Sequence, residues 1–376
     1  MPAYDAFLLV SFGGPEGSGD VMPFLANVTR GRGVPPERLA SVAEHYYAVG
    51  GVSPINQQCR DLLAAIRAAF PASDLSLPVY WGNRNWTPYL TDTVRAMAAD
   101  GVKRAVALVT SAYSSYSSCR QYLEDIERAR AEAGPDAPRI DKIRRFFNHP
   151  GFIEPFAANT RAALATLPAD LRDDAHLVFT AHSIPVAMAR ASGSGGTNRY
   201  VTELTEAAGL VAERAGGGTH PWTLAYQSRS GPPTQPWLEP DIRDHLGELS
   251  KSGVKAVVVV PVGFVSDHME VRHDLDVEAA QTADSLGLAF ARAATPGSHP
   301  AFVSMITDLV RERLALPDDT APDNPAPDNP APDSPGPDSP GPDSTVLDYP
   351  ALGGLGMPDH DCPADCCRYV GGASRT

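Results

Sequence analysis

The sequence predicts an α/β fold in which two doubly wound, Rossmann-like domains follow one another along the chain. Short apolar or β-branched runs alternate with longer stretches of helical spacing, and this alternation occurs in two similar halves that divide near residue 145. Such alternation is typical of parallel sheets covered by helices on both faces. A chain of 376 residues, 43% of them hydrophobic, is large enough for two domains with real cores.

The strands are predicted from six apolar runs. In the first half these are residues 6–10 (AFLLV), 78–82 (PVYWG) and 104–110 (RAVALVT). In the second half they are residues 176–180 (HLVFT), 223–227 (TLAYQ) and 255–262 (KAVVVVPV). Amphipathic stretches between them, such as QQCRDLLAAIRAAF and NRYVTELTEAAGLVAERA, predict helices. Ligands of doubly wound folds bind outside the carboxyl ends of the strands, so the loops there are the candidate site.

Four regions follow from these patterns. We expect an N-terminal Rossmann-like domain (1–145), a C-terminal one (146–316), a linker (317–345) and a short cysteine-bearing segment (346–376). The linker is a five-residue repeat of the type PDNPA and PDSPG, without large apolar side chains. It cannot bury a core, so we expect a disordered, extended tether.

The net charge of −14 is concentrated at the C-terminal end, where eleven acidic residues and two arginines follow residue 316. The rest of the chain is only mildly acidic, and neither part favours nucleic acid or an anionic membrane surface as a partner. No run of about 18 apolar residues predicts a transmembrane helix. The first residues lack the basic start of a signal peptide, so we expect a cytoplasmic protein.

The cysteines of a cytoplasmic protein are expected to be thiols or metal ligands rather than disulfides. Cys362, Cys366 and Cys367 lie within six residues of one another. Three thiolates need a fourth ligand, for which His360 and Cys119, in the loop after the third strand, are candidates. From the residues alone, both a zinc ion and an iron–sulfur cluster remain open.

A row of acids follows the most apolar run of the chain, in the segment SDHMEVRHDLDVE. If residues 269–286 form a helix, Glu270, Asp274 and Glu278 lie one turn apart on one face. A solvated face is the commonest explanation of such a row. Its position at the mouth of a buried strand favours instead a loosely held divalent metal ion, because carboxylate oxygens suit hard or borderline cations.

A histidine stands at the end of another strand, where AHSIP places His182. A lone histidine is often structural, but at this position in an α/β fold it is a candidate proton acceptor near neutral pH. A base and a row of carboxylates together suit the insertion of a divalent metal into a macrocycle. In that reaction two N–H protons must leave while the ion loses its water and enters.

These motifs resemble the ferrochelatase family. AHSIP and SDHMEVRHDLDVE are similar to its signature pair, and LLVSFGGPEG, YAVGGVSPINQQ, VTSAYSSYSSC and WTLAYQSRSGPPTQPWLEPD extend the similarity over about residues 6–315. The sequence most resembles actinobacterial-type enzymes that carry a [2Fe–2S] cluster and act on coproporphyrin III. The resemblance implies a lyase of heme biosynthesis that inserts Fe²⁺ into a porphyrin held between two Rossmann-like domains and yields Fe-coproporphyrin (coproheme).

The resemblance also implies site residues by matching positions. His182 would be the catalytic proton acceptor and Glu270 its partner across the macrocycle, with Asp274 and Glu278 guiding metal or protons, so that all four are candidate metal contacts. Substrate contacts are implied for Arg30, Arg32, Tyr46, Ser53 and Tyr113. A cluster of structural or regulatory role would be held by Cys119, Cys362, Cys366 and Cys367.

The sequence departs from the family pattern in three places. Phe12 stands where some relatives have a tyrosine near the metal, and a phenyl ring cannot ligate iron. The spacing C-x₃-C-C and the Pro-Asp repeat also differ. The alternatives are a protoporphyrin IX ferrochelatase, a non-catalytic porphyrin or iron carrier, and an electron-transfer protein. We expect a monomer that meets coproporphyrin III, Fe²⁺ and a transient iron donor or downstream heme-pathway protein.

Overall fold

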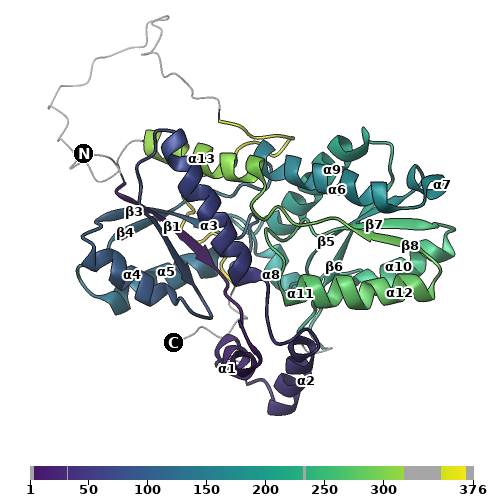
Figure 1. Cartoon of the computed structure of the whole chain (residues 1–376), viewed down its shortest axis with the longest axis horizontal. Helices are drawn as coiled ribbons and strands as arrows, with labels where there is room; N and C mark the ends of the chain where they lie inside the picture. The colour runs from purple at the N-terminus through teal and green to yellow at the C-terminus, as the bar shows by residue number, and fades with distance from the viewer. Residues whose placement is uncertain (1–3, 32, 232–233, 317–348, 370–376) are drawn as a thin grey trace, which may run out of the picture.

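The computed structural model describes residues 4–31, 33–231, 234–316 and 349–369. Two four-stranded parallel sheets, each flanked by helices, lie side by side in Figure 1. The α/β class with two doubly wound units is therefore confirmed. The predicted linker at 317–345 lies outside the described residues.

The first sheet has the strand order β2-β1-β3-β4. Its strands are β1 (Ala6–Ser11), β2 (Val79–Asn83), β3 (Arg104–Val109) and β4 (Arg139–Lys142). Helices α4 (Leu90–Ala99) and α5 (Gln121–Ala133) cover one face, and α3 (Ile55–Ala72) packs on the other. Both faces of β1 are covered, which explains why its sequence is continuously apolar rather than alternating.

The second sheet repeats this order as β6-β5-β7-β8. Its strands are β5 (His176–His182), β6 (Trp222–Gln227), β7 (Ala256–Val260) and β8 (Ala289–Arg292). Helices α6 (Pro150–Thr166) and α9 (Arg199–Gly216) pack on one face. The other face is covered by α10 (Ile242–Lys251) and by the succession α11 (Met269–His273), the π-helix η2 (Asp274–Ala279) and α12 (Ala280–Ser285).

The six predicted strands are all present, whereas β4 and β8 were not predicted. Both have four residues, RIDK and AFAR, and both lie at a sheet edge, where they are only partly buried. A strand of four residues that includes charged side chains and is only partly buried carries little hydrophobic signal.

One hydrophobic core continues through both halves. It joins Phe7 of β1 to Phe179 of β5, and its centre includes the packed rings of Phe146, Phe152 and Phe302. Helix α13 (Pro300–Ala315) follows β8 in sequence but packs against α3 of the first half as well as α6. The limits of the two domains at residue 145 therefore stay a prediction, because packing does not divide there.

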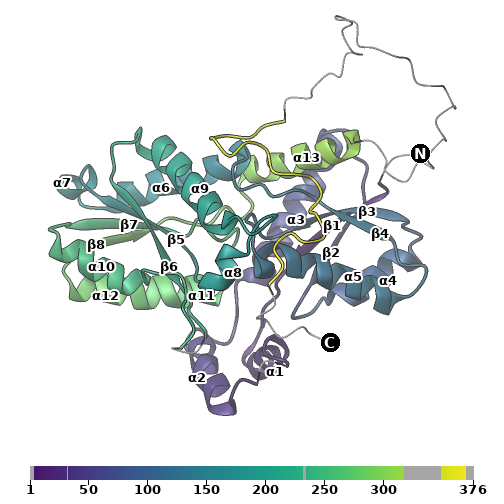
Figure 2. The ribbon, with the colours of Figure 1, turned by 180° about the vertical axis from the view of Figure 1, so that it is seen from behind.

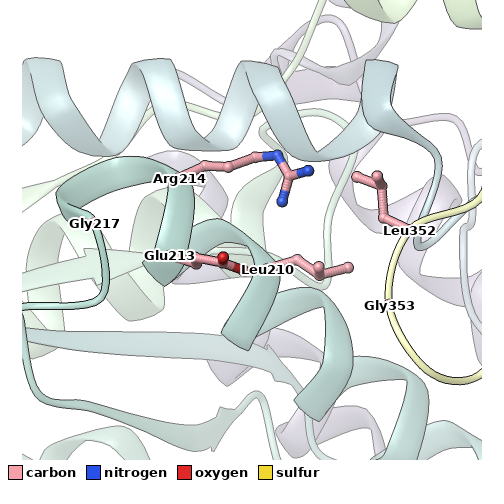
Figure 3. Close-up of a pocket in the computed structure, with 6 residues that line it drawn as sticks. All are labelled: Leu210, Glu213, Arg214, Gly217, Leu352 and Gly353. Atoms are coloured by element: carbon pink, nitrogen blue, oxygen red, sulfur yellow. The ribbon is translucent and has the colours of Figure 1, made fainter.

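The described part of the C-terminal segment is docked onto both halves. It runs past α13 and between the two sheets in Figure 2. Asn148 and Leu352 exchange hydrogen bonds of 2.9 and 3.0 Å, and Glu206 of α9 accepts from the amides of Gly354 and Leu355. A hollow of about 650 Å³ lies between this segment and α9. Figure 3 shows the residues that line it, Leu210, Glu213, Arg214, Gly217, Leu352 and Gly353.

The remaining elements carry the loops of the site. Helices α1 (Ser18–Val28) and α2 (Pro36–Tyr47) project together from the body of the molecule in Figure 1. A second π-helix, η1 (Tyr116–Arg120), precedes α5, while α7 (Ala169–Arg172) and α8 (Val186–Arg190) are short. No helix among the described residues is both long and apolar enough to cross a bilayer.

Candidate functional site

His182 and Glu270 meet at the carboxyl edge of the second sheet. His182 is the last residue of β5, and Glu270 is the second residue of α11, which begins shortly after β7. His182 Nε2 lies 3.4 Å from Glu270 Oε1. The two side chains are 30% and 46% exposed, so solvent and small solutes can reach both.

Their backbones are held by buried polar contacts. The hydroxyl of Tyr200, in the first turn of α9, donates to the carbonyl oxygen of His182 at 2.8 Å. The side-chain amide of Gln227, the last residue of β6, donates to the carbonyl oxygen of Glu270 at 2.7 Å. His182 Nδ1 also contacts the Ser183 carbonyl. The pair is thus positioned by three neighbouring strands and one helix.

The pair is ionic at neutral pH. Burial lowers the pKa of His182, but the charge of Glu270 and the hydrogen bonds to Glu270 and Ser183 outweigh it and raise that pKa to about 9. Burial raises the pKa of Glu270, and His182 more than offsets this and lowers it to about 2. His268 Nδ1 lies 3.8 Å from the other carboxylate oxygen, so Glu270 stands between two imidazoles.

This geometry corrects one expectation. The sequence interpretation set His182 and Glu270 on opposite faces of a macrocycle, but a separation of 3.4 Å leaves no room for one between them. The reason is topological, because β5 and β7 are neighbours in one sheet and their carboxyl ends open at the same edge. Both groups therefore belong to the same wall.

The acid row continues from Glu270 into the π-helix η2, which begins at Asp274. π-helical turns are rare and occur frequently at functional sites. Burial raises the pKa of Asp274 to about 6, and the charges of Glu270 and Glu278 add to the increase, although a hydrogen bond from Ser228 lowers it. Asp274 can therefore take up or release a proton near neutral pH.

The outer end of the row is a candidate metal position. Single ligand atoms of His273, Asp274 and Glu278 lie within 4.8 Å of one another, and no other such group of three occurs in the described part of the chain. Arg243 Nη1 lies 3.4 Å from Glu278 Oε2 and so partly neutralises this end. The predicted row of Glu270, Asp274 and Glu278 is thus a connected surface of three acids.

The first half contributes an aromatic wall near these acids. Phe24 makes edge-on contacts to Phe12, Tyr46 and Trp86, with ring centroids 6.0 to 6.4 Å apart. Burial raises the pKa of Tyr46, and the charges of Glu270 and Asp274 raise it further, which places its hydroxyl within their field. Phe12 is 37% exposed and offers only a hydrocarbon face.

The other predicted substrate contacts are spread around this wall. Ser53 is buried where its amide donates to the Pro15 carbonyl at 2.8 Å, and Arg30 is exposed after α1. Tyr113 lies in the core, and its hydroxyl donates to the Val262 carbonyl at 2.9 Å. Arg32 lies outside the described residues. Contact with substrate stays a prediction for all of them. This prediction has the least support for Tyr113, because its hydroxyl already has a partner.

Three histidines were not predicted. His268 and His273 flank Glu270, and the ring of His45 on α2 stacks on His273 with centroids 3.7 Å apart and planes 6° from parallel. Burial lowers the pKa of His45, and the nearby His273 adds to the decrease. The signal was present, because two histidines interrupt the acidic segment SDHMEVRHD, but nothing in the sequence points to the stack with α2.

The four predicted thiols converge at the junction between the sheets. Cys119 of η1, Cys366 and Cys367 are buried, and Cys362 is half-buried. The sulfurs of Cys366 and Cys367 are 3.7 Å apart. A hydrogen bond to Cys362, followed by burial, raises the pKa of Cys119 well above its usual value, so these two thiols are also in contact.

The thiols are surrounded by donors and a cation. The amide of Gly193 donates to Cys367 Sγ at 3.2 Å, and Arg145 Nη1 lies 3.7 Å from Cys362 Sγ. Arg120 fixes the same segment through a 2.9 Å hydrogen bond to the Ala364 carbonyl. His360, the alternative fourth ligand, contacts Glu312 at 3.2 Å instead. The structure thus brings together the four cysteines and not the histidine.

Comparisons with known proteins point in one direction. The chain is 51% identical to the coproporphyrin III ferrochelatase of Streptomyces griseus, over 97% of this chain and 93% of that one. It is 57% identical to the protein of the same name from Nocardia farcinica, over 83% and 89%. A protein named ferrochelatase from Rhodopirellula baltica is 49% identical, over 98% and 95%.

Comparisons with solved structures and with family models agree with the similarity in sequence. SirB from Bacillus subtilis with Fe³⁺ superposes with a TM-score of 0.50 at 14% identity, over 82% of this chain and 95% of that one, which is a likeness of fold alone. Residues 4–314, and so nearly all of the two sheets and their helices, match the family model described as ferrochelatase. With half of its residues identical to named members over almost its full length, this chain belongs to the ferrochelatase family.

Proposed function

We propose that this protein inserts Fe²⁺ into coproporphyrin III to give Fe-coproporphyrin, with His182 and Glu270 at the reacting centre and Asp274 and Glu278 as the path for metal or protons. Identity of about half to relatives named coproporphyrin III ferrochelatase supports the reaction and the substrate. The observation that carries the assignment of residues is the ion pair of His182 and Glu270 at the carboxyl edge of the second sheet.

The pair must change state before it can act as a base. At neutral pH His182 already carries a proton, because Glu270 raises its pKa to about 9. When Fe²⁺ reaches Glu270, the metal replaces the imidazolium as its counter-ion. Burial then lowers the pKa of His182, so the imidazolium releases its proton to the solvent that reaches its partly exposed side chain and becomes a neutral acceptor. Metal arrival and base activation are thereby a single event.

The protons then leave along the acids. His182 accepts one pyrrole N–H proton, and the second passes to a carboxylate as the ion enters the ring. Asp274, with a pKa of about 6, can carry a proton toward Glu278 and the solvent at neutral pH. The macrocycle is presented to this wall from the side of Phe12 and Tyr46, whose apolar rings suit a flat porphyrin face.

The choice of porphyrin rests on the relatives and on charge. Coproporphyrin carries four propionates and protoporphyrin two, so the former needs more cations and donors at its edge. Arg30 is an exposed cation after α1 and Ser53 a hydroxyl beside the β1 loop, which makes them candidates for propionates. Protoporphyrin IX remains the alternative substrate.

We also assign the thiol site to a [2Fe–2S] cluster held by Cys119, Cys362, Cys366 and Cys367. Two sulfurs bound to one tetrahedral ion at about 2.3 Å lie about 3.8 Å apart. The 3.7 Å between Cys366 and Cys367 suits such a pair. No three of these described thiols lie within 4.8 Å of one another, as four ligands of one ion would. Cys362 contacts both Cys119 and Cys366, so the four thiols form a connected row rather than the compact tetrahedron of a single zinc ion, and such a row suits the two irons of a cluster.

When bound, such a cluster supplies one-electron exchange and cross-links the C-terminal segment to η1. The 97% of this chain that aligns with the Streptomyces griseus protein extends beyond residue 316 into that segment. The residues that we assign to metal insertion lie elsewhere, on β5, α11 and η2.

The test is an anaerobic incubation of the purified protein with Fe²⁺ and either coproporphyrin III or protoporphyrin IX. We expect the free-base absorption bands to disappear faster with coproporphyrin III. His182→Ala should lower turnover by about 10²- to 10⁴-fold, the usual contribution of a positioned base, while porphyrin binding persists. The control is His176→Ala, at the opposite end of the same strand.

Two results would contradict the proposal. Porphyrin binding without any change of the bands in the wild-type protein would make it a carrier. Equal loss of turnover in the variants at His176 and His182 would show that His182 acts through the stability of β5 and not as a base.

A further inference from the structure

Arg145 is a buried cation in contact with the thiol site. Its Nη1 lies 3.7 Å from Cys362 Sγ, and its side chain is only 7% exposed. Burial would lower the pKa of this guanidinium, but the charges of Glu203 and of the thiols raise it. Arg145 is therefore a permanent positive charge with almost no contact to water.

The same guanidinium is shared with a carboxylate. Arg145 Nε lies 3.2 Å from Oε1 of Glu203 on α9, which is completely buried. Glu203 also accepts from the amide and the hydroxyl of Ser114, at 2.7 and 2.8 Å, just before η1. These contacts fix Glu203, so Arg145 cannot move toward the sulfurs without losing an ion pair in a medium of low polarity.

A four-thiolate [2Fe–2S] cluster is an anion, and it becomes more negative by one charge on reduction. A buried cation a few ångströms away stabilises the reduced form more than the oxidised form, whereas a buried carboxylate does the opposite. Lys142 is a second buried cation that acts on Cys119. The reduction potential of a cluster at this position therefore depends on a small number of fixed charges.

We propose that the buried ion pair of Arg145 and Glu203 positions Cys362 and sets the reduction potential of the thiol site. Arg145 raises this potential, and Glu203 lowers it. This inference rests on the cluster assigned above, and it gives a role to two residues outside the set of ligands. Arg145 acts here through the cluster and not on the porphyrin.

The two members of the pair should shift the potential in opposite directions. Arg145→Met removes the positive charge at similar length, so the midpoint potential should become more negative. Glu203→Gln keeps the hydrogen-bonding shape and removes the negative charge, so the potential should become more positive. Arg145→Lys keeps the charge and should stay near the wild-type value.

The matched control is Arg120→Met. Arg120 binds the same segment, but through the carbonyl oxygen of Ala364 rather than a sulfur, and it is paired with Glu124 at 3.0 Å. Loss of this arginine should leave the potential unchanged while it weakens the same docked segment. An electrostatic role of Arg145 is thereby separated from simple loosening of the segment.

The experiment is a redox titration of the full-length protein followed by visible absorption and electron paramagnetic resonance, with iron and sulfide analysis of each variant. Opposite shifts in Arg145→Met and Glu203→Gln, with Arg145→Lys and Arg120→Met near wild type, are the expected result. Equal potentials in Arg145→Met and wild type would overturn the proposal, as would shifts of the same sign in both members of the pair. Wild-type protein without bound iron and sulfide would overturn the cluster itself.

The result is independent of metal insertion. If the potentials shift as expected but the wild-type protein fails to metallate coproporphyrin III, the assigned reaction is wrong while the role of Arg145 stands. If Arg145→Met does not fold, Arg145→Lys against Glu203→Gln still gives the decisive comparison, because only the latter changes the charge.

Discussion

The imidazole of His182 and the carboxylate of Glu270 are in contact, with Nε2 and Oε1 3.4 Å apart. Two strands that are adjacent in one sheet deliver these groups to the same edge, and the low exposure of the surrounding residues strengthens their attraction. The resting pair is therefore an imidazolium and a carboxylate. A base of this kind is inactive until something else takes its place beside Glu270.

Removal of the carboxylate should release the proton from His182. In Glu270→Gln, burial is opposed only by the Ser183 hydrogen bond and the charge of Asp274, so the pKa of His182 should fall well below 9. An NMR titration of the histidine ring signals measures this directly. Glu278→Gln is the control, because that carboxylate is not a cause of the His182 shift. A ring that still titrates near 9 in Glu270→Gln would contradict the assigned pair.

The same pair should make stability depend on pH. The raised pKa of His182 contributes stability that is complete below about 6.5 and is lost as the pH rises through about 9. The lowered pKa of Glu270 contributes above about 4.5 and is lost as the pH falls through about 2. The pair therefore favours the folded state most between about 4.5 and 6.5.

The measurement is urea unfolding of wild type and His182→Gln across this range. Because both side chains are a third to a half exposed, we expect a difference of at most about 1 kcal/mol between pH 6 and pH 10. A wild-type protein that gains stability relative to the variant above pH 9 would have the wrong sign and would exclude the ion pair.

Much of the framework could be predicted because buried strands are apolar and can be recognised in the sequence. The runs that became β1, β3, β5 and β7 are apolar on both faces, and parallel sheets place their carboxyl ends together. The acid row of Glu270, Asp274 and Glu278 followed from helical spacing alone. The π-turn at Asp274 leaves no comparable pattern, since it depends on how that helix packs.

The parts that could not be predicted depend on contacts between distant residues. The order of strands in the sheet, and not their sequence, puts His182 beside Glu270. The stack of His45 on His273 joins α2 to α11, and the pair of Arg145 and Glu203 joins residues 58 positions apart. A hydrophobic pattern specifies which face of an element is buried, but it does not specify the polar partner that this face meets.

Glu278, at the outer end of the acid row, should affect the apparent KM for Fe²⁺. Arg243 lies 3.4 Å from Glu278, so an incoming Fe²⁺ must compete with a guanidinium. Glu278→Ala should raise the apparent KM for Fe²⁺, and Arg243→Ala should lower it. Because exposed ion pairs contribute up to about 1 kcal/mol, the change in Arg243→Ala should not exceed about fivefold.

Steady-state rates at varied Fe²⁺ and saturating porphyrin measure both effects. Lys251→Ala is a suitable control, because Lys251 is also a surface cation of α10 but pairs with Glu248 at 2.7 Å. The same direction of change in the variants at Glu278 and Arg243 would exclude competition between metal and guanidinium.

The hydroxyl of Tyr200 should hold the reacting histidine in place. It donates to the carbonyl oxygen of His182 at 2.8 Å, and its loss in Tyr200→Phe leaves that carbonyl without this donor at a cost of about 1 to 3 kcal/mol. The expected result is a lower kcat with little change in the KM for porphyrin, since the ring remains and only the orientation of His182 suffers.

Tyr113→Phe is a close match for this variant. Tyr113 is equally buried, its ring lies 6.4 Å from that of Tyr200, and its hydroxyl also donates to a backbone carbonyl, that of Val262. Both variants should unfold at similarly lower denaturant concentrations, whereas only Tyr200→Phe should lower kcat. A KM for coproporphyrin III that rises in Tyr113→Phe would instead restore the predicted substrate contact of Tyr113, because loss of its hydrogen bond to the Val262 carbonyl gives no reason for weaker substrate binding.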